Sequence, residues 1–218
     1  MSFIGKLKKY FVAIAIAATP LIGYATEKTQ SQPSYSELRA LDHNYITQEE
    51  EYYSAVATGV ISTNTLSDDS VPIDQASFFN NEVRKSIQPA IVHARGMELD
   101  ELEVAMQGQG LKTDIFYATT MTKEKLASIA QTVTNDPNQV MIANYDQSYT
   151  GLNTGLTYGI IAGYDAKNKR VLMMNVSPTQ KKLQWIKLEN LVKGMQVLNK
   201  DKCPHGFIIV SKPLLDDE

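Results

Sequence analysis

The sequence contains a single cysteine, Cys203, among its 218 residues. One cysteine cannot close an internal disulfide, so we expect a free thiol or an intermolecular bridge. An excess of charge is also missing, because 21 Lys and Arg residues face 24 Asp and Glu residues and leave a formal charge of -3. This near balance gives no electrostatic reason to expect nucleic acid or an anionic membrane surface as a partner.

Internal repeats, low-complexity tracts and metal-ligand spacings are absent as well. The three histidines, His43, His93 and His205, are scattered along the chain, so we expect no metal ion and no other cofactor. His205 follows Cys203 by two residues, but both precede a predicted terminal strand that is distant in sequence from the other candidate residues. We therefore expect neither of them to be catalytic.

The first 25 residues have the pattern of an export signal. Three lysines within residues 6–9 form a basic region, and residues 11–22 form an apolar run that is short for a bilayer span. Residues 23–25, Gly-Tyr-Ala, place small side chains where a signal peptidase reads the chain. We expect cleavage after Ala25 and a periplasmic or secreted bacterial protein.

The alternative for this segment is an uncleaved anchor in the inner membrane, and we expect membrane contact only through such an anchor. Residues 26–34 are polar and include Pro33, so they are predicted to form a linker. A single globular domain is predicted over residues 35–218, with 43% hydrophobic residues in the whole chain to supply its core.

The hydrophobic pattern of the domain changes from helical to strand-like along the chain. Small and β-branched residues from Tyr53 to Ile61 suit a central helix against which a sheet packs closely. Asp74 is predicted to cap a helix that runs to about Ser86, and Thr122 to open another. Strands are predicted at 113–119, 140–144, 157–164, 170–176 and 206–212. Helices followed by an antiparallel sheet indicate an α+β fold.

Residues 48–66 carry the most informative motif. Gln48 is followed after five residues by Ser-Ala-Val-Ala-Thr at 54–58, and then by Asn-Thr-Leu at 64–66. This stretch resembles the nucleophile segment of phytochelatin synthases, which reads Gln, five residues, Cys-Gly-x-Ala-Ser and then Asn-Ala-Leu. The resemblance implies a papain-like fold, with Ser54 at the position of the nucleophilic cysteine and Gln48 at that of the oxyanion donor.

Other segments of that family are matched too. Residues 156–165 resemble its Gly-His-x-Ser-Pro-x-x-x-Tyr strand, with Thr157 at the general-base histidine. Residues 171–176 resemble its hydrophobic strand ending in Asp-Val, with Asn175 at the orienting aspartate. The similarity extends from about Tyr35 to Lys212 and includes Phe-Phe-Asn-Asn-Glu at 78–82, Arg-Gly-Met-Glu-Leu-Asp-Glu-Leu at 95–102 and Gly-Phe-Ile-Ile-Val-Ser-Lys at 206–212.

The resemblance implies the chemistry that these substitutions affect. In the family, a cysteine thiol attacks the γ-glutamylcysteinyl-glycine bond of glutathione, releases glycine and passes the acyl group to another thiol or to water. A serine hydroxyl is harder to ionise than a thiol and needs a base within hydrogen-bond reach, and Thr157 cannot accept that proton. Glutamates at 49–51 would oppose an anionic intermediate, or would stabilise a helix start from a solvated face.

We therefore interpret the chain as a phytochelatin synthase-like pseudoenzyme whose cleft serves an unknown protein partner or a γ-glutamyl peptide. A scaffold without a ligand is the plainer form of this hypothesis. The alternative is a residual γ-glutamyl peptide hydrolase or transpeptidase that uses Ser54. Pro178 replaces a family arginine, and Lys181 or Lys182 is a candidate substitute as partner of a ligand carboxylate.

Overall fold

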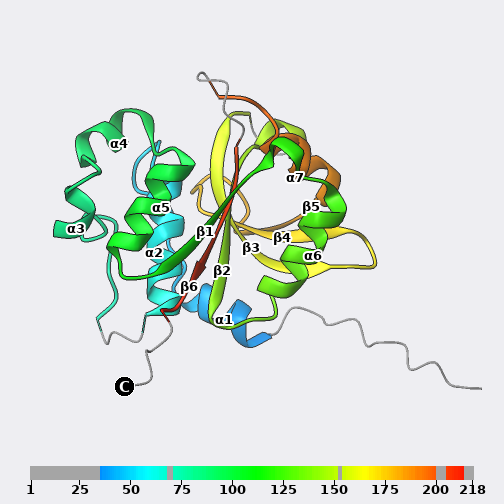
Figure 1. Cartoon of the computed structure of the whole chain (residues 1–218), viewed down its shortest axis with the longest axis horizontal. Helices are drawn as coiled ribbons and strands as arrows, with labels where there is room; N and C mark the ends of the chain where they lie inside the picture. Colours follow the sequence, from blue (N-terminus) through cyan, green and yellow to red (C-terminus); the bar gives the residue numbers. More distant parts are fainter. Residues whose placement is uncertain (1–34, 68–70, 152–153, 200–204, 214–218) are drawn as a thin grey trace, which may run out of the picture.

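The computed structural model of the protein describes residues 35–67, 71–151, 154–199 and 205–213. Helices and strands follow one another as shown in Figure 1, and their bounds are α1 Tyr35–His43, α2 Ser54–Leu66, α3 Asn81–Arg84, α4 Pro89–Arg95, α5 Leu99–Gly108, β1 Lys112–Tyr117, η1 Ala118–Thr120, α6 Lys123–Val133, β2 Gln139–Asp146, η2 Gln147–Thr150, β3 Leu156–Asp165, β4 Arg170–Asn175, β5 Leu183–Lys187, α7 Leu188–Met195 and β6 Gly206–Ser211.

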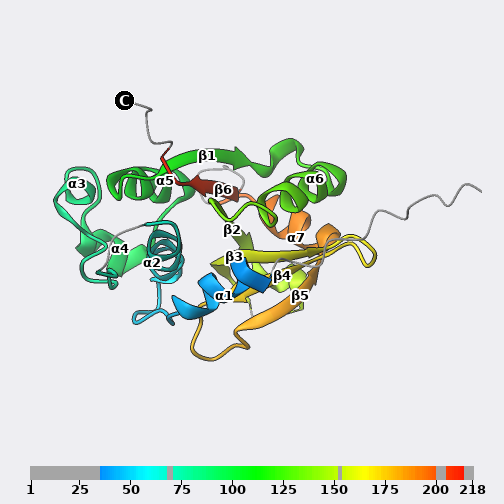
Figure 2. The same ribbon diagram turned by 90° about the horizontal axis from the view of Figure 1, so that it is seen from below.

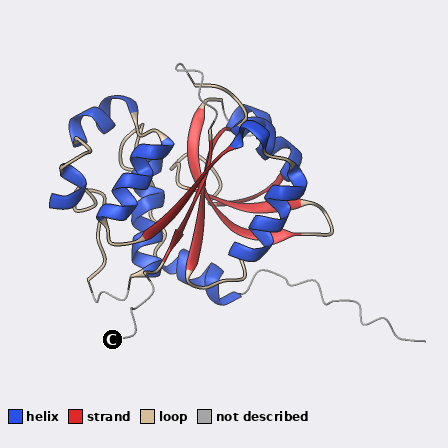
Figure 3. Cartoon of the chain, viewed as in Figure 1, coloured by secondary structure: helices blue, strands red, loops and turns tan. Residues whose placement is uncertain are grey.

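The six strands form one sheet in the order β1-β6-β2-β3-β4-β5, and every neighbouring pair is antiparallel. The last strand of the chain, β6, lies between β1 and β2, where Gly206 pairs with both Tyr117 and Asn144. Figure 3 shows the strands as a twisted sheet between the helices. Segments that are far apart in the sequence are therefore neighbours in the sheet.

Two hydrophobic clusters fill the two faces of the sheet. One face carries Ile142, Ile160 and Ile208 and packs against α1, α2 and the α3 to α5 region. The opposite face carries Met141, Ile161, Phe207 and their neighbours and packs against α6 and α7. Figure 2 shows this separation, with α2 to α5 on one side and α6 and α7 on the other. The result is an α+β fold, as predicted.

Helix α2 is buried along nearly its whole length, which is unusual for a helix rich in small and polar residues. Most of its hydroxyl groups are satisfied locally, because Thr58 donates to the carbonyl of Ser54 at 2.9 Å and Ser62 donates to that of Thr58 at 2.8 Å, whereas the buried Thr63 hydroxyl has no partner among the described residues. Gly59 allows close packing, since a Cβ there would lie 2.7 Å from the ring of Phe78. The predicted central helix is thus confirmed, and it begins at Ser54.

Several predicted elements agree with the structure and some do not. The five predicted strands correspond to β1, β2, β3, β4 and β6, and Thr122 caps α6 by accepting a hydrogen bond from the backbone of Lys125. The helix predicted from Asp74 to Ser86 is wrong. The Asp74 carboxylate instead closes a turn by accepting from the backbone N–H of Ser77 at 2.7 Å, and only the short α3 follows, capped by Asn80.

Helices α1, α4 and α7 and strand β5 were not predicted as separate elements. The predicted export signal, the linker over residues 26–34 and Cys203 lie outside the described residues. Within the described ranges, no helix has the length and apolar character needed to cross a membrane.

The close approach of β1 and β6 generates a stability prediction at Gly206. A Cβ at this position would overlap the backbone carbonyl of Phe116, which cannot move without separating paired strands. We expect Gly206→Ala to lower the free energy of unfolding by about 3 kcal/mol or more in a denaturant titration. Gly110→Ala is the control, because φ is +79° but nothing lies within 4 Å, and its expected cost is about 1–2 kcal/mol. Equal losses for the two variants would contradict the argument.

Candidate functional site

A cleft of about 670 Å³ lies where the start of α2 meets the ends of several strands. Its walls come from residues 48–54, the loop 95–98, the start of β3 and the loop 177–180. Gln48, Ser54 and Thr157 line this cleft, so the fold brings together three of the four residues singled out from the sequence. Asn175 is 3% exposed and lies beside the cleft, on β4 opposite Gly159 of β3.

Ser54 is the first residue of α2, and no side chain caps that helix. Its Oγ accepts a hydrogen bond of 3.2 Å from the backbone N–H of Tyr158. No side-chain base among the described residues bonds to this hydroxyl. The serine therefore joins the helix to β3 through a backbone contact, and nothing in that contact activates it as a nucleophile.

Thr157 is next to Tyr158 in β3, but its side chain makes no contact with Ser54. Its hydroxyl donates to the carbonyl of Tyr158 at 3.3 Å, and its own carbonyl accepts from the amide of Asn144 at 3.4 Å. A threonine hydroxyl has no basic nitrogen, so the position offers no proton acceptor comparable with an imidazole.

Asn175 is held by contacts within the protein. Its Nδ2 donates to the carbonyl of Lys181 at 3.0 Å, and its Oδ1 accepts from the phenol of Tyr145 at 3.4 Å. Its backbone carbonyl accepts from the phenol of Tyr45 at 3.1 Å. The amide thus fixes the loop after β4 and does not orient a neighbour in the cleft.

Gln48 lines the cleft with an amide whose two N–H groups are both occupied. Nε2 donates to the carbonyls of Glu50 at 2.8 Å and Glu51 at 2.7 Å. Its backbone N–H donates to Val176 at 2.8 Å. An oxyanion donor must keep an N–H free for the developing charge, and this side chain instead closes its own loop.

Tyr158 is a residue whose role the sequence did not indicate. Its backbone holds Ser54, and its buried phenol donates to the carbonyl of Met97 at 3.1 Å. Burial, followed by the charges of Glu98, Glu101 and Asp100, raises the pKa of this phenol well above its ordinary value. Tyr158 therefore stays protonated and ties the 95–98 loop to β3, which shapes one wall of the cleft.

Carboxylates dominate the charge of the cleft. Glu51 and Glu98 line it together with Arg95, but Arg95 is neutralised by two hydrogen bonds to Glu101 at 2.9 and 2.6 Å. Burial alone would raise the pKa of Glu101, but the bonds from Arg95 and from the backbone of Glu98 outweigh it and lower that pKa. Of the acidic run at residues 49–51, Glu51 lines the cleft.

The lysines proposed as ligand partners are not cleft residues. Lys182 pairs with Asp42 at 2.5 Å and lies 4.0 Å from the centre of the Tyr45 ring, while Lys181 contributes its carbonyl to Asn175. Pro178 does line the cleft and offers no charge there. Among the described residues, therefore, no lysine faces the cleft to bind a ligand carboxylate.

His205 is the second residue that sequence reasoning missed. Its expected distance from the site was wrong, because β6 pairs with β2 and returns the residue before Gly206 to the cleft wall. The side chain is 3% exposed, and its Nε2 has no hydrogen-bond partner among the described residues. Burial lowers the pKa of this imidazole, against the opposing charges of Glu98 and Asp146. His205 is thus a buried neutral imidazole in a polar cleft.

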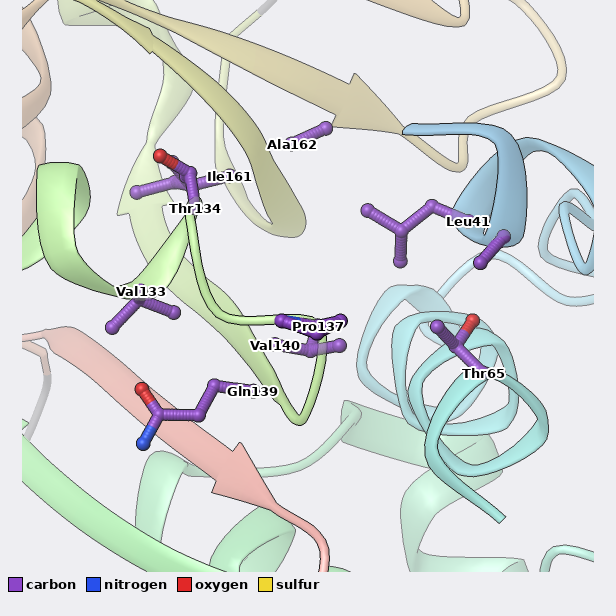
Figure 4. Close-up of a pocket in the computed structure, with 10 residues that line it drawn as sticks. Leu41, Thr65, Val133, Thr134, Pro137, Gln139, Val140, Ile161 and Ala162 are labelled. Carbon is purple, nitrogen blue, oxygen red and sulfur yellow. The ribbon is translucent and has the colours of Figure 1, made fainter. Parts of the chain in front are cut away.

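A second cavity, of about 100 Å³, lies near the opposite ends of β2 and β3 (Figure 4). Figure 4 shows Leu41, Val140 and Ala162 among its lining side chains. It contains no titratable side chain, so it offers no chemistry and is not a candidate active site. No group of described residues has the composition of a metal site.

The buried imidazole predicts a pH-dependent stability. Because the pKa of His205 is lowered in the folded protein from an ordinary value of 6.5, the unfolded chain takes up a proton first as the pH falls. Wild-type protein is expected to lose stability below about pH 6.5, and His205→Leu to lose less of it over the same range, with equal or higher stability at pH 8. Melting temperatures between pH 8 and pH 5 measure this difference. His43→Gln, at the exposed end of α1, is the control, and parallel pH profiles for wild type and His205→Leu would contradict the assignment.

Comparison with known proteins identifies the family of the chain. A search among curated proteins found no match. The family model described as phytochelatin synthase matches residues 21–207, which is most of the chain and includes Gln48, Ser54, Thr157 and Asn175. The α+β architecture and the helix that begins at Ser54 agree with the papain-like fold of that family. The chain therefore belongs to the phytochelatin synthase family, a family of glutathione-related transpeptidases.

Proposed function

We propose that this protein is a pseudoenzyme of the phytochelatin synthase family whose cleft binds a peptide or a segment of a partner protein without cleaving it. The observation that carries the proposal is the engagement of Ser54. Its hydroxyl accepts from the backbone of Tyr158, no described basic side chain forms a hydrogen bond with it, and Thr157, at the position predicted for the base, is itself a hydroxyl. A serine with no proton acceptor is a poor nucleophile.

The size of the expected loss of turnover supports the proposal of a pseudoenzyme. Removing the nucleophile or the base from a serine protease triad costs about 10⁶ in turnover. Asn175 would not by itself prevent catalysis, because Cys-His-Asn sites are active in papain-like enzymes. Here the base position is changed as well, and the amide N–H groups of Gln48 are used within its own loop. Several requirements for acyl transfer are therefore unmet together.

The cleft itself is retained, which supports binding as its remaining role. Its volume of about 670 Å³ falls within the range of ligand sites in proteins. Exposed Tyr52 and Leu156 and the amides of Asn144, Gln147 and Gln180 line it, so it offers both apolar contacts and hydrogen bonds to a peptide. Export to the periplasm through the N-terminal segment is part of the proposal and places the partner outside the cytoplasm.

A residual hydrolase or transpeptidase is the second candidate function. The position of Ser54 favours it, since a half-buried hydroxyl opens a 13-residue helix inside the cleft, and uncapped amides at a helix start can stabilise an oxyanion. Turnover that depends on Ser54 would separate this activity from pure binding.

The central test is cleavage of glutathione by the purified protein. We expect no glycine release above that of heat-treated protein, because the Ser54 hydroxyl has no base. Ser54→Ala is the matched variant, and it is expected to leave any background unchanged. Glycine release by wild type that disappears in Ser54→Ala would establish the residual enzyme instead.

A second test asks whether the altered residues are the reason for inactivity. We expect Ser54→Cys combined with Thr157→His to release glycine at a low rate, with Asn175 kept because its two amide contacts support the loop after β4. Each single variant should remain inactive, since the members of such a site act as a unit. A double variant that folds but stays inactive would indicate that Gln48 or substrate binding prevents turnover. Gln48→Ala in that background would then be uninformative, because there would be no restored activity for it to lower.

A further inference from the structure

The uncompensated charge of the cleft indicates what kind of ligand fits it. Glu51 and Glu98 are exposed carboxylates in its lining, and because Arg95 is paired with Glu101, no free cation remains among the described residues of that lining. Glu98 accepts hydrogen bonds from the N-terminal turn of α5 and from the amide of Asn199, but these neutral donors do not cancel its charge. A bound cation would be stabilised electrostatically by lying close to both carboxylates.

Neighbouring residues extend the same field. Burial lowers the pKa of His205, and the negative charge of Asp146 opposes that shift. Burial raises the pKa of the Tyr53 phenol at the start of α2, and the charges of Glu50 and Glu49 raise it further. Glutathione carries two carboxylates and one ammonium group, so it would meet net repulsion here. A ligand with a lysine, an arginine or a free amino terminus would meet attraction.

His205 supplies an independent sign of a ligand. A buried imidazole nitrogen without a partner is costly, because its lost hydrogen bonds to water are not replaced within the protein. A ligand that forms a hydrogen bond with this nitrogen would remove that cost. Because burial keeps this imidazole neutral, one of its nitrogens is an acceptor, and an acceptor suits the N–H groups of a cationic ligand.

We propose that the cleft recognises a basic peptide segment, with Glu51 and Glu98 as counter-ions of its cationic group, Tyr52 as an aromatic contact and His205 as a hydrogen-bond acceptor. This inference rests on the proposed binding function of the cleft and adds the class of its ligand. The ring of Tyr52 is 45% exposed in the lining, where it can contact the aliphatic part or the charge of a lysine or arginine.

The test compares acetylated and amidated pentapeptides that differ only at the central residue, which is Lys, Gln or Glu, together with glutathione. Binding to the full chain is followed by NMR chemical-shift titration, which measures weak Kd values and locates the site. At about 20 mM salt, we expect the Lys peptide to bind about tenfold more tightly than the Glu peptide, with shifts at Glu51 and Tyr158. At about 500 mM salt, the preference should shrink severalfold, because exposed charges are then screened.

Matched variants assign the preference to the named carboxylates. Glu51→Gln with Glu98→Gln should bring the Kd values of the three peptides to within about twofold, and a Gln at position 98 can still accept the bond that caps α5. Glu189→Gln, at the exposed start of α7, removes the same charge elsewhere and should leave the Lys preference unchanged. His205→Leu should weaken the Lys peptide about fivefold without lowering the melting temperature.

The outcomes separate this inference from the proposed function. Equal or tighter binding of the Glu peptide or glutathione, no binding of the Lys peptide, or an unchanged Lys preference in the double variant would overturn the assignment of a basic ligand. Unchanged affinity in His205→Leu would remove His205 from the site. Glycine release that depends on Ser54 would instead overturn the pseudoenzyme, whatever the charge preference.

Discussion

Burial of α2 is the constraint on which the rest of the structure depends. This helix has almost no exposed side, so it needs small residues, internally bonded hydroxyls and a sheet that packs tightly against it. Gly59 and Phe78 meet on one side of it, and the isoleucines of the central strands meet it on the other. Its first residue is thereby fixed at the ends of β2 and β3, where the cleft opens. The position of Ser54 follows from packing, whatever chemistry the residue performs.

Residues that the family resemblance singled out make contacts that support the architecture. Ser54 links α2 to β3, Asn175 holds the loop after β4, and Gln48 closes the loop before α2. Such contacts give these polar residues a structural role that does not depend on catalysis. A buried or half-buried polar group must be paired to avoid a cost of about 1–3 kcal/mol, and each of these groups is paired. The fold therefore has a use for these side chains whether or not the protein catalyses a reaction.

Much of the fold could be predicted from the sequence because the strands and the central helix have local signals. Short hydrophobic runs located the strands, and the small-residue run located α2. The error at Asp74 is also local, because Asp74 and Asn80 are both good caps, and the chain uses the first for a turn and the second for α3. Local pattern alone does not tell which of two competing caps begins a helix.

The arrangement of the cleft needed information that no single segment contains. Motif similarity brought Gln48, Ser54 and Thr157 together correctly, since their family positions define one site. His205 escaped notice because strand order, and not sequence distance, places it: β6 inserts between β1 and β2 and carries the residue before it to the cleft. Tyr158 escaped notice because it acts through a backbone N–H, which every residue type except proline possesses.

The contrast between His205 and the residues singled out from the sequence bears on how the protein works. Ser54 and Asn175 are hydrogen-bonded within the chain, whereas the Nε2 of His205 is buried without a partner among the described residues. Selection for stability alone would favour an apolar side chain at position 205, because an unpaired polar group destabilises a core. A gain made on binding a ligand at the cleft would offset this cost at position 205, which lines the cleft. A ligand that forms a hydrogen bond with the imidazole and faces Glu51 and Glu98 accounts for both the buried unpaired nitrogen and the presence of the cleft.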